Sequence, residues 1–527
     1  MSTVFFLDVN YYGEVFRFSS HPIDLVDLST GSNVSYFGGL DGVEYNQQSK
    51  LVGYNLDEDA ISLELLFAKI NWMKEWIGNR TLDGSDCVLY LGNEEAASIQ
   101  ELDQIAIGKI HDSIFGYPDK VKGWISFSIE NNEVSQGSIK ILPEYNKLNP
   151  SNFDVIIPNV ITGAIIPIVF GTPANFFWVN EGGILFNIGD VFGSPVYPLG
   201  MSAVTGWFPF VIAYGRIEAT QIKIFDKEGG YIEDYVQVGK DLLGREYSYI
   251  EFTNTPISSN GRFSFVFDDP SQVFWSEWGG NHGGGILSPY GPGPLTGAGD
   301  ICLYFLEKSN IDYDYSNWNA IREYLNKYEF SGYINDPEVT IWEWLQDAII
   351  NFLPIEIVNS GRGISPVVNL LLDNNPIPSH HLIDNSDCRI ITGLQPIDID
   401  IVNSVRVSSA WDGRIEKFKS STIVNSDNSQ IARNSENIYG IQELEVEAPY
   451  IYDPNTATRI AHDIIAMQGL KRYAIELSTS DRYSYLAVGD IISISSEYLD
   501  IDSVLGQIIS KAWNEPNWTY VVQLTTN

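Results

Sequence analysis

Near its end the chain passes from a helical to a strand-like pattern of apolar positions. Asp453 and Pro454 predict the start of a helix, because an aspartate can accept the first free N–H groups and a proline lacks one. The apolar residues that follow recur at helical spacing: Ala457, Ile460, Ala461, Ile464, Ile465 and Met467. Gly469 predicts a left-handed residue that ends the helix. Strand-like runs follow at 473–477, 486–494, 504–510 and 518–524, so we expect one helix against a small antiparallel β-barrel.

A similar order of elements occurs near the N-terminus. Residues 63–77 have helical spacing, and strand-like runs follow at 88–91 and 121–129. Gly108 and Pro118 are ten residues apart, as are Gly506 and Pro516, and each pair lies before a final strand. The repeated order predicts an internal duplication that gives one chain two similar barrels. The alternative is chance, since glycine and proline mark most turns.

The remaining patterns divide the chain into four predicted parts and make its fold class mainly β with α+β parts. Residues 1–150 predict an N-terminal β-barrel hub domain, and 155–300 a β-rich middle domain. Residues 301–372 predict an α+β domain, and 373–527 a C-terminal β-barrel hub domain with one helix. The segment 279–299 is rich in glycine and proline, so we expect little packing or regular hydrogen bonding there. It fits either a plug that moves or a plain linker.

Two helices are expected in the α+β part. Ser316 predicts the cap of a helix whose apolar stripe is Trp318, Ile321, Leu325 and Tyr328. Thr340 and Glu343 have the spacing of a capping box, in which each side chain bonds the other residue's backbone N–H. That box opens a second helix, over 341–353. We expect it to bury Trp344, Leu345 and Ile349.

Composition and charge narrow the function. The chain has 527 residues, 44% of them hydrophobic and 19% charged, which indicates a globular protein with more than one core. Aromatic residues make up 13%, which favours β structure. The formal charge of −37, from 68 acids and 31 bases, argues against a protein that grips nucleic acid or an anionic membrane. Such a chain still lets DNA pass without binding it.

Cysteine usage and the apolar runs give three further expectations. Cys87, Cys302 and Cys388 are far apart and fit no metal spacing, so we expect buried free thiols. Residues 1–16 lack the basic start of a signal peptide. The most apolar run, 155–171, is interrupted by prolines and predicts buried strands in preference to a membrane span.

No group of residues predicts catalysis. The densest set of potential metal ligands fits no zinc spacing and is interpreted as a polar loop: Ser379, His380, His381, Asp384, Asp387 and Cys388. His282 is interpreted as an unliganded surface histidine in the glycine-rich segment. Acidic pairs at Asp268–Asp269 and Glu443–Glu445 are the kind that flank a sugar, but surface solvation is the favoured interpretation. Glu447 continues the second pair, because Glu443, Glu445 and Glu447 alternate with Leu444 and Val446 as on the wet face of a strand. We therefore predict no catalytic, cofactor-binding or metal residues, no cofactor and no enzymatic activity.

Three stretches together resemble a known family. They are 108–118 with the strand after it, 299–353 with its two helices, and 457–524 with its helix and last strands. Their order is similar to that of the central tail hub (tail-tip or baseplate hub) proteins of long-tailed bacteriophages. The resemblance implies a structural homotrimer in which each chain gives two similar barrels, so that six barrels match a six-fold tail tube.

The resemblance also implies partners and a location. The partners would be the distal tail or tail tube protein, the tape measure protein and tail fibre or tip proteins, with DNA passing without specific binding during ejection. The protein would lie in the virion, at the phage tail tip, after assembly in the host cytoplasm. The alternative is a surface or secreted carbohydrate-binding or glycan-cleaving β protein, since aromatic rings stack on sugars. The expected lack of a signal peptide and the odd cysteine count favour the hub.

Overall fold

A computed structural model describes most of the chain. The described residues are 3–48, 64–73, 82–116, 122–130, 139–142, 147–148, 162–171, 177–179, 185–187, 192–198, 208–215, 223–225, 231–232, 237–239, 247–252, 274–278, 285–359, 362–372, 376–412, 416–514 and 517–525. The fold is mainly β with α+β parts, as the sequence predicts. No described helix is long and apolar enough to cross a membrane.

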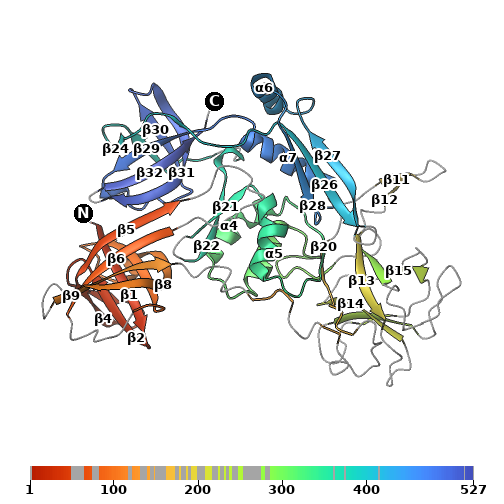
Figure 1. The fold of residues 1–527 in the computed structure, drawn as a ribbon, viewed down its shortest axis with the longest axis horizontal. Coiled ribbons are helices and arrows are strands. Elements are labelled where there is room, and N and C mark those ends of the chain that lie inside the picture. The colour runs from red at the N-terminus through yellow and green to blue at the C-terminus, as the bar shows by residue number, and fades with distance from the viewer. Residues whose placement is uncertain are drawn as a thin grey trace.

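The largest sheet has 16 strands and takes them from both ends of the chain. Its N-terminal strands are β1 (Thr3–Tyr11), β2 (Glu14–Ser19), β3 (Ile23–Asp27), β4 (Ser32–Gly38), β5 (Leu40–Gln48), β6 (Glu64–Met73), β7 (Asp86–Asn93), β8 (Asp103–Gly116) and β9 (Lys122–Glu130). Its C-terminal strands are β23 (His380–Ile383), β24 (Cys388–Ile390), β25 (Gln395–Pro396), β29 (Tyr473–Thr479), β30 (Ile491–Ser496), β31 (Ile501–Asn514) and β32 (Asn517–Leu524). Figure 1 shows the two groups next to each other, red to orange and blue.

A nine-stranded sheet forms the middle of the chain. Its strands are β10 (Ile168–Phe170), β13 (Phe192–Pro198), β14 (Phe208–Tyr214), β15 (Lys223–Phe225), β16 (Tyr231–Ile232), β17 (Gln237–Gly239), β18 (Tyr247–Phe252), β19 (Phe274–Trp278) and β20 (Gly332–Ile334), and β11 (Phe177–Val179) and β12 (Leu185–Asn187) pair separately. In the apolar run 155–171, β10 is a fully buried strand. Because β20 pairs with β10, the helical part contributes the last strand of this sheet.

The helical part holds α3 (Ala298–Leu306), α4 (Tyr315–Leu325), α5 (Ile341–Ala348) and the hairpin of β21 (Ile355–Asn359) and β22 (Ile364–Val368). The predicted capping box at the start of α5 is present. Its predicted core residues, Trp344, Leu345 and Ile349, are all buried. The predicted cap of α4 is wrong: the Asp314 side chain accepts from the Asn317 N–H, so the helix begins at Tyr315, two residues earlier than a Ser316 cap allows.

A three-stranded sheet with two helices follows. The sheet consists of β27 (Lys417–Val424), β26 (Ser404–Asp412) and β28 (Glu443–Ala448), and the helices are α6 (Gln430–Tyr439) and α7 (Pro454–Gln468). The predicted part 373–527 therefore holds α6 in addition to the helix expected. The Asp453 cap and Pro454 in the first turn of α7 are confirmed.

Two predictions about α7 are wrong, one about its packing and one about the residue that ends it. Its apolar stripe packs in the core shared by the helical part and the three-stranded sheet, not against the C-terminal barrel strands. Gly469 has a right-handed φ of −67°, so it is no left-handed cap. A Cβ there would lie 2.5 Å from the Ile465 carbonyl oxygen, and close packing is what requires the glycine.

Residues 64–73 are strand β6, so the helix predicted over 63–77 is wrong there. The apolar run is compatible with either period, and pairing with β5 and β9 on its two sides decides in favour of a strand. The remainder of that prediction, beyond residue 73, lies outside the described residues.

The glycine-rich segment is anchored where it is described, over 285–299, so the expectation of little packing is wrong there. Ile286 N–H donates to the Val169 carbonyl, Leu295 N–H donates to the Ile286 carbonyl, and both side chains are buried. A Cβ at Gly285 would clash with the Val169 carbonyl, so this glycine permits close contact with β10. The earlier residues, with His282, lie outside the described part.

The three cysteines are buried and free, as predicted. Burial raises the pKa of the Cys87 and Cys388 thiols to about 12, which keeps them protonated and unreactive at neutral pH.

Candidate functional site: the junction of two duplicated sheets

Two sets of four antiparallel strands have the same topology. In the N-terminal set the strands pair in the order β6-β9-β8-β7, and in the C-terminal set in the order β29-β32-β31-β30. When the strands of each set are numbered in chain order, the first strand lies beside the fourth, the fourth beside the third, and the third beside the second. The predicted duplication is visible in this pairing. The counterpart of β6 is strand β29, whereas the sequence pattern matches this region with the helix α7.

The third strands of the two sets match in detail. Both β8 and β31 are 14 residues long, and Gly108 and Gly506 each stand sixth in their strand. Gly108 pairs with Cys87 on the second strand, and Gly506 pairs with Ile492. Each strand then bulges against its fourth strand a few residues beyond the glycine. At Gly506 a Cβ would lie 2.5 Å from Val522 Cγ1, so the strands approach too closely there for a larger residue. The turns with Pro118 and Pro516 lie outside the described residues.

One strand joins the two sets into a continuous sheet. β5 pairs with β6 of the N-terminal set along one edge and with β31 of the C-terminal set along the other. Figure 1 shows β5 reaching from the orange strands towards the blue ones. Main-chain hydrogen bonding across β5 therefore fixes the position of one set relative to the other.

Aromatic side chains pack across the same junction. The ring of Phe5, on β1, lies 5.9 Å from that of Trp513 and 6.3 Å from that of Trp518. The two tryptophan rings are 5.0 Å apart. Phe5 and Trp518 are buried in one core that contains residues of both sets. Thr3 N–H adds a hydrogen bond of 3.0 Å to Asp481 Oδ2 across the junction.

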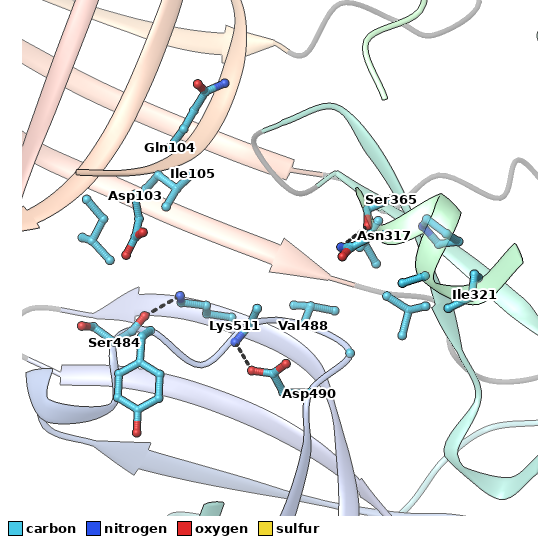
Figure 2. Close-up of a pocket in the computed structure, with 18 residues that line it drawn as sticks. Asp103, Gln104, Ile105, Asn317, Ile321, Ser365, Ser484, Val488, Asp490 and Lys511 are labelled. Carbon is cyan, nitrogen blue, oxygen red and sulfur yellow. Dashed lines mark hydrogen bonds between the residues drawn. The ribbon is translucent and has the colours of Figure 1, made fainter. Parts of the chain in front are cut away.

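A cavity of about 550 Å³ lies where the two sets meet the helical part (Figure 2). Asp103 and Gln104 of β8 line one side, and Asp490 and Lys511 line the second. The third side comes from the helical part, where Asn317 Nδ2 donates to Ser365 Oγ at 2.8 Å. An adjoining cavity of about 680 Å³ continues along the seam between the two sets.

Lys511 is the buried cation of this junction. Its ammonium donates to the Ser484 carbonyl at 2.7 Å and lies 4.6 Å from the centre of the Trp518 ring. Burial lowers the pKa of Lys511 to about 8, and the carboxylates of Asp490 and Asp103 offset part of that effect. Burial likewise raises the pKa of Asp490, whose Oδ2 accepts from the Ala487 N–H.

The C-terminal set is also tied to the helical part. Gln507 Nε2 donates to the Val368 carbonyl at 2.9 Å and to the Gly489 carbonyl at 3.1 Å. Gly489 has φ +97°, and a Cβ there would lie 2.6 Å from Val367 Cγ1. Both the backbone conformation and the close approach therefore require glycine at this position.

The polar loop predicted over 379–388 is wrong for His380–Ile383, which form β23 and pair in parallel with β30, whereas residues 385–387 do form a turn before β24. His380 Nε2 is 2.7 Å from the Tyr485 hydroxyl, and His381 Nδ1 is 2.9 Å from Ser493 Oγ. Asp384 accepts from Ser496 Oγ, and Asp387 accepts from the Tyr483 hydroxyl. Each of these four side chains forms a hydrogen bond with a tyrosine or serine side chain. No three metal-ligating side chains converge among the described residues.

The acidic and aromatic residues considered as candidates for sugar binding differ in exposure. Glu443, Glu445 and Glu447 of β28 are exposed and Val446 is buried, as predicted for a strand with one wet face. Asp268 and Asp269 lie outside the described residues. The largest fully buried side chains include Trp318, Trp518 and Tyr520, so these rings belong to the core and not to a sugar-binding surface.

The sequence patterns did not indicate the two features that build the junction. β5 carries polar residues at its C-terminal end and has no periodic signal for a bridging strand. Lys511 stands between Ser510 and Ala512 in β31, and a lone lysine in a strand is usually exposed. Alternation places Lys511 on the same face as Trp513, and this is the one inward signal in the sequence; the bulge between Ile508 and Ser510 interrupts the alternation before it.

Comparison with known proteins gives one kind of match. No model of a known protein family matches this chain, and no curated protein does. Among solved structures, the tail protein from Neisseria meningitidis MC58 is 9% identical with a TM-score of 0.40, over 99% of this chain and 97% of that one. The 43 kDa tail protein of prophage MuSo2 from Shewanella oneidensis is 7% identical with a TM-score of 0.34, over 99% and 98%.

A chain of the native gene transfer agent particle is 11% identical with a TM-score of 0.41, over 74% of this chain and 89% of that one. These three solved structures are tail and virion proteins. Likeness at this level assigns no function, which has to come from the geometry of the chain itself.

Proposed function

We propose that this protein is a structural, non-enzymatic hub of a phage tail tip or baseplate. In the proposed assembly three copies form a ring, and the two duplicated sets of each copy give it six similar units. Such a ring joins a six-fold tail tube to a three-fold tip and surrounds the path of the DNA. The partners proposed are the distal tail or tail tube protein, the tape measure protein and the fibre or tip proteins.

The observation that carries the proposal is the duplication. A trimer of chains with one barrel each presents three equal surfaces, whereas a trimer of duplicated chains presents six similar ones. The two sets must then keep a fixed distance and angle. The shared strand β5 and the packing of Phe5 against Trp513 and Trp518 supply that rigidity.

The charge balance supports a channel wall. With 68 acids and 31 bases, the chain carries a formal charge of −37. A surface of this sign repels DNA phosphates, so DNA passes without being held. We propose that the protein is assembled in the host cytoplasm and remains in the virion, at the tail tip.

Measurement of mass in solution tests the trimer. We expect sedimentation equilibrium over a range of micromolar concentrations to give three times the chain mass of 59.0 kDa. A chain that stays monomeric and binds a glycan array would instead support the carbohydrate-binding or glycan-cleaving alternative. A stable dimer would contradict the proposal, because two duplicated chains offer four similar units and not six.

A further inference from the structure

The three-stranded sheet of β27, β26 and β28 ends in two open edges. In the described part of the chain β27 pairs only with β26, and so does β28. No backbone hydrogen bond from outside the sheet reaches Lys417, Phe418 or residues 420–424 among the residues described. The Ile423 carbonyl is covered by Asn428 Nδ2, which leaves the earlier residues of β27 as the open edge. An open edge is a template for pairing with another strand.

The two edges carry opposite charge. β27 has the exposed residues Lys417 and Lys419 and no acid, whereas β28 has the exposed Glu443, Glu445 and Glu447 and no base. Because acids outnumber bases 68 to 31 in the chain, a strand with lysines alone departs from the overall balance.

The charged side chains lie on one face of the sheet. Glu445 pairs with Arg406 of β26, and Arg406 pairs with Ile423 of β27, so one row of side chains crosses all three strands. The neighbouring rows, with Val405 and Val407, are buried in the core that contains α7. Cross-strand neighbours on one face interact directly, and opposite charges there are favourable.

The strand directions allow the edges to join. β26 is antiparallel to β27 and parallel to β28. If β28 of one copy lies beside β27 of a second copy that keeps the same direction of sheet, the two strands run antiparallel. The register that sets Glu445 opposite Lys419 also sets Glu447 opposite Lys417, and it is the register proposed here. Such a contact uses two different surfaces of each chain, which is the head-to-tail type that closes into a ring.

Exposed isoleucines surround the end of the sheet at which β27 ends and β28 begins. Ile423 is 41% exposed and Ile431 is 37% exposed, while Ile438 and Ile441 are 65% and 63% exposed. They lie on β27, on α6 and just before β28. Figure 1 shows α6 standing at the outer end of this sheet. Several exposed apolar side chains in one short region are typical of a surface that another protein covers.

We propose that β27 of one copy pairs with β28 of the next, so that the three-stranded sheets of neighbouring copies join head to tail. The inference rests on the proposed trimer and names the surface that holds it together. The bland alternative is that the two lysines only protect an open edge from pairing.

Charge reversal in the full-length protein tests the contact. The first variant is Lys417→Glu with Lys419→Glu, the second is Glu445→Lys with Glu447→Lys, and the third combines all four changes. We expect the first two each to raise the concentration of half-assembly about tenfold, because cross-strand charge pairs change from attractive to repulsive. The third should return close to the parent, since glutamates again face lysines.

Two controls separate charge from folding. Lys308→Glu with Lys471→Glu makes the same change in net charge at exposed positions elsewhere and should assemble like the parent. Lys417→Gln with Lys419→Gln adds no new charge and should shift assembly less, in the same direction. Melting curves show whether each variant is folded.

The outcomes separate this inference from the proposed function. A parent that is monomeric at every concentration overturns the hub and this contact together. A trimeric parent whose lysine variants assemble as well as the control, or more readily, leaves the hub standing and overturns the contact. A combined variant as weak as the two separate ones also overturns it.

Discussion

Lys511 and Asp490 place opposite charges inside the junction. Burial lowers the pKa of Lys511 and raises the pKa of Asp490, and both shifts favour the neutral form of the side chain. The lysine is held by the Ser484 carbonyl and the Trp518 ring, both within the C-terminal set. Asp103, which lines the same cavity, comes from the N-terminal set. Single residues therefore make the fit between the sets sensitive to charge.

Replacing Lys511 by methionine should change how stability depends on pH. Because burial lowers the pKa of Lys511 to about 8, the folded chain loses this proton at lower pH than the unfolded chain, whose lysine keeps the ordinary pKa of 10.5. Between these pH values the unfolded state binds more protons, so the free energy of unfolding of the parent rises with pH. Relative to Lys511→Met, the parent should gain about 1.4 kcal/mol per pH unit in that window.

Urea unfolding followed by tryptophan fluorescence, from pH 7 to pH 10, measures the difference between parent and variant. Lys471→Met, at an exposed position, should show a constant difference over the same range. A constant difference for Lys511→Met as well would mean that water reaches the ammonium and that the junction is open.

Elements with strong local signals were predictable, and elements defined by distant pairing were not. α5 and α7 begin with caps that satisfy their own first N–H groups, so their starts could be read from a few residues. β6 could not, because its neighbours β5 and β9 decide between strand and helix. For the same reason the sequence indicated two similar groups of strands, but not the strand that joins them.

Trp344 of α5 tests the packing of the helical part. Its ring lies 4.9 Å from that of Phe305 and 5.4 Å from that of Phe170, and the side chain is buried. Replacing it by alanine should lower the free energy of unfolding by about 3–5 kcal/mol, as for other large aromatic residues in a core. Tyr498→Ala removes a ring that is 88% exposed and should change stability little. If both variants unfolded alike, Trp344 would not be a core residue of the assembled chain.

At the scale of the whole molecule, the fold brings the two ends of the chain together. β1 near the N-terminus and β32 near the C-terminus belong to one 16-stranded sheet, and the helical part closes the cavity between the two sets. The candidate functional site is thus a property of the complete chain. It could not be predicted from any one stretch, since the cavity takes residues from β8, α4 and β31.

We propose that one chain supplies two equivalent units to a ring of six. Electron microscopy of the purified protein, averaged over particles seen along the ring axis, tests this arrangement. We expect six similar β-rich densities at nearly equal angles around an open centre, with additional density repeated three times outside or below them. A three-fold particle in which only one of the two sets contributes to the ring would contradict it.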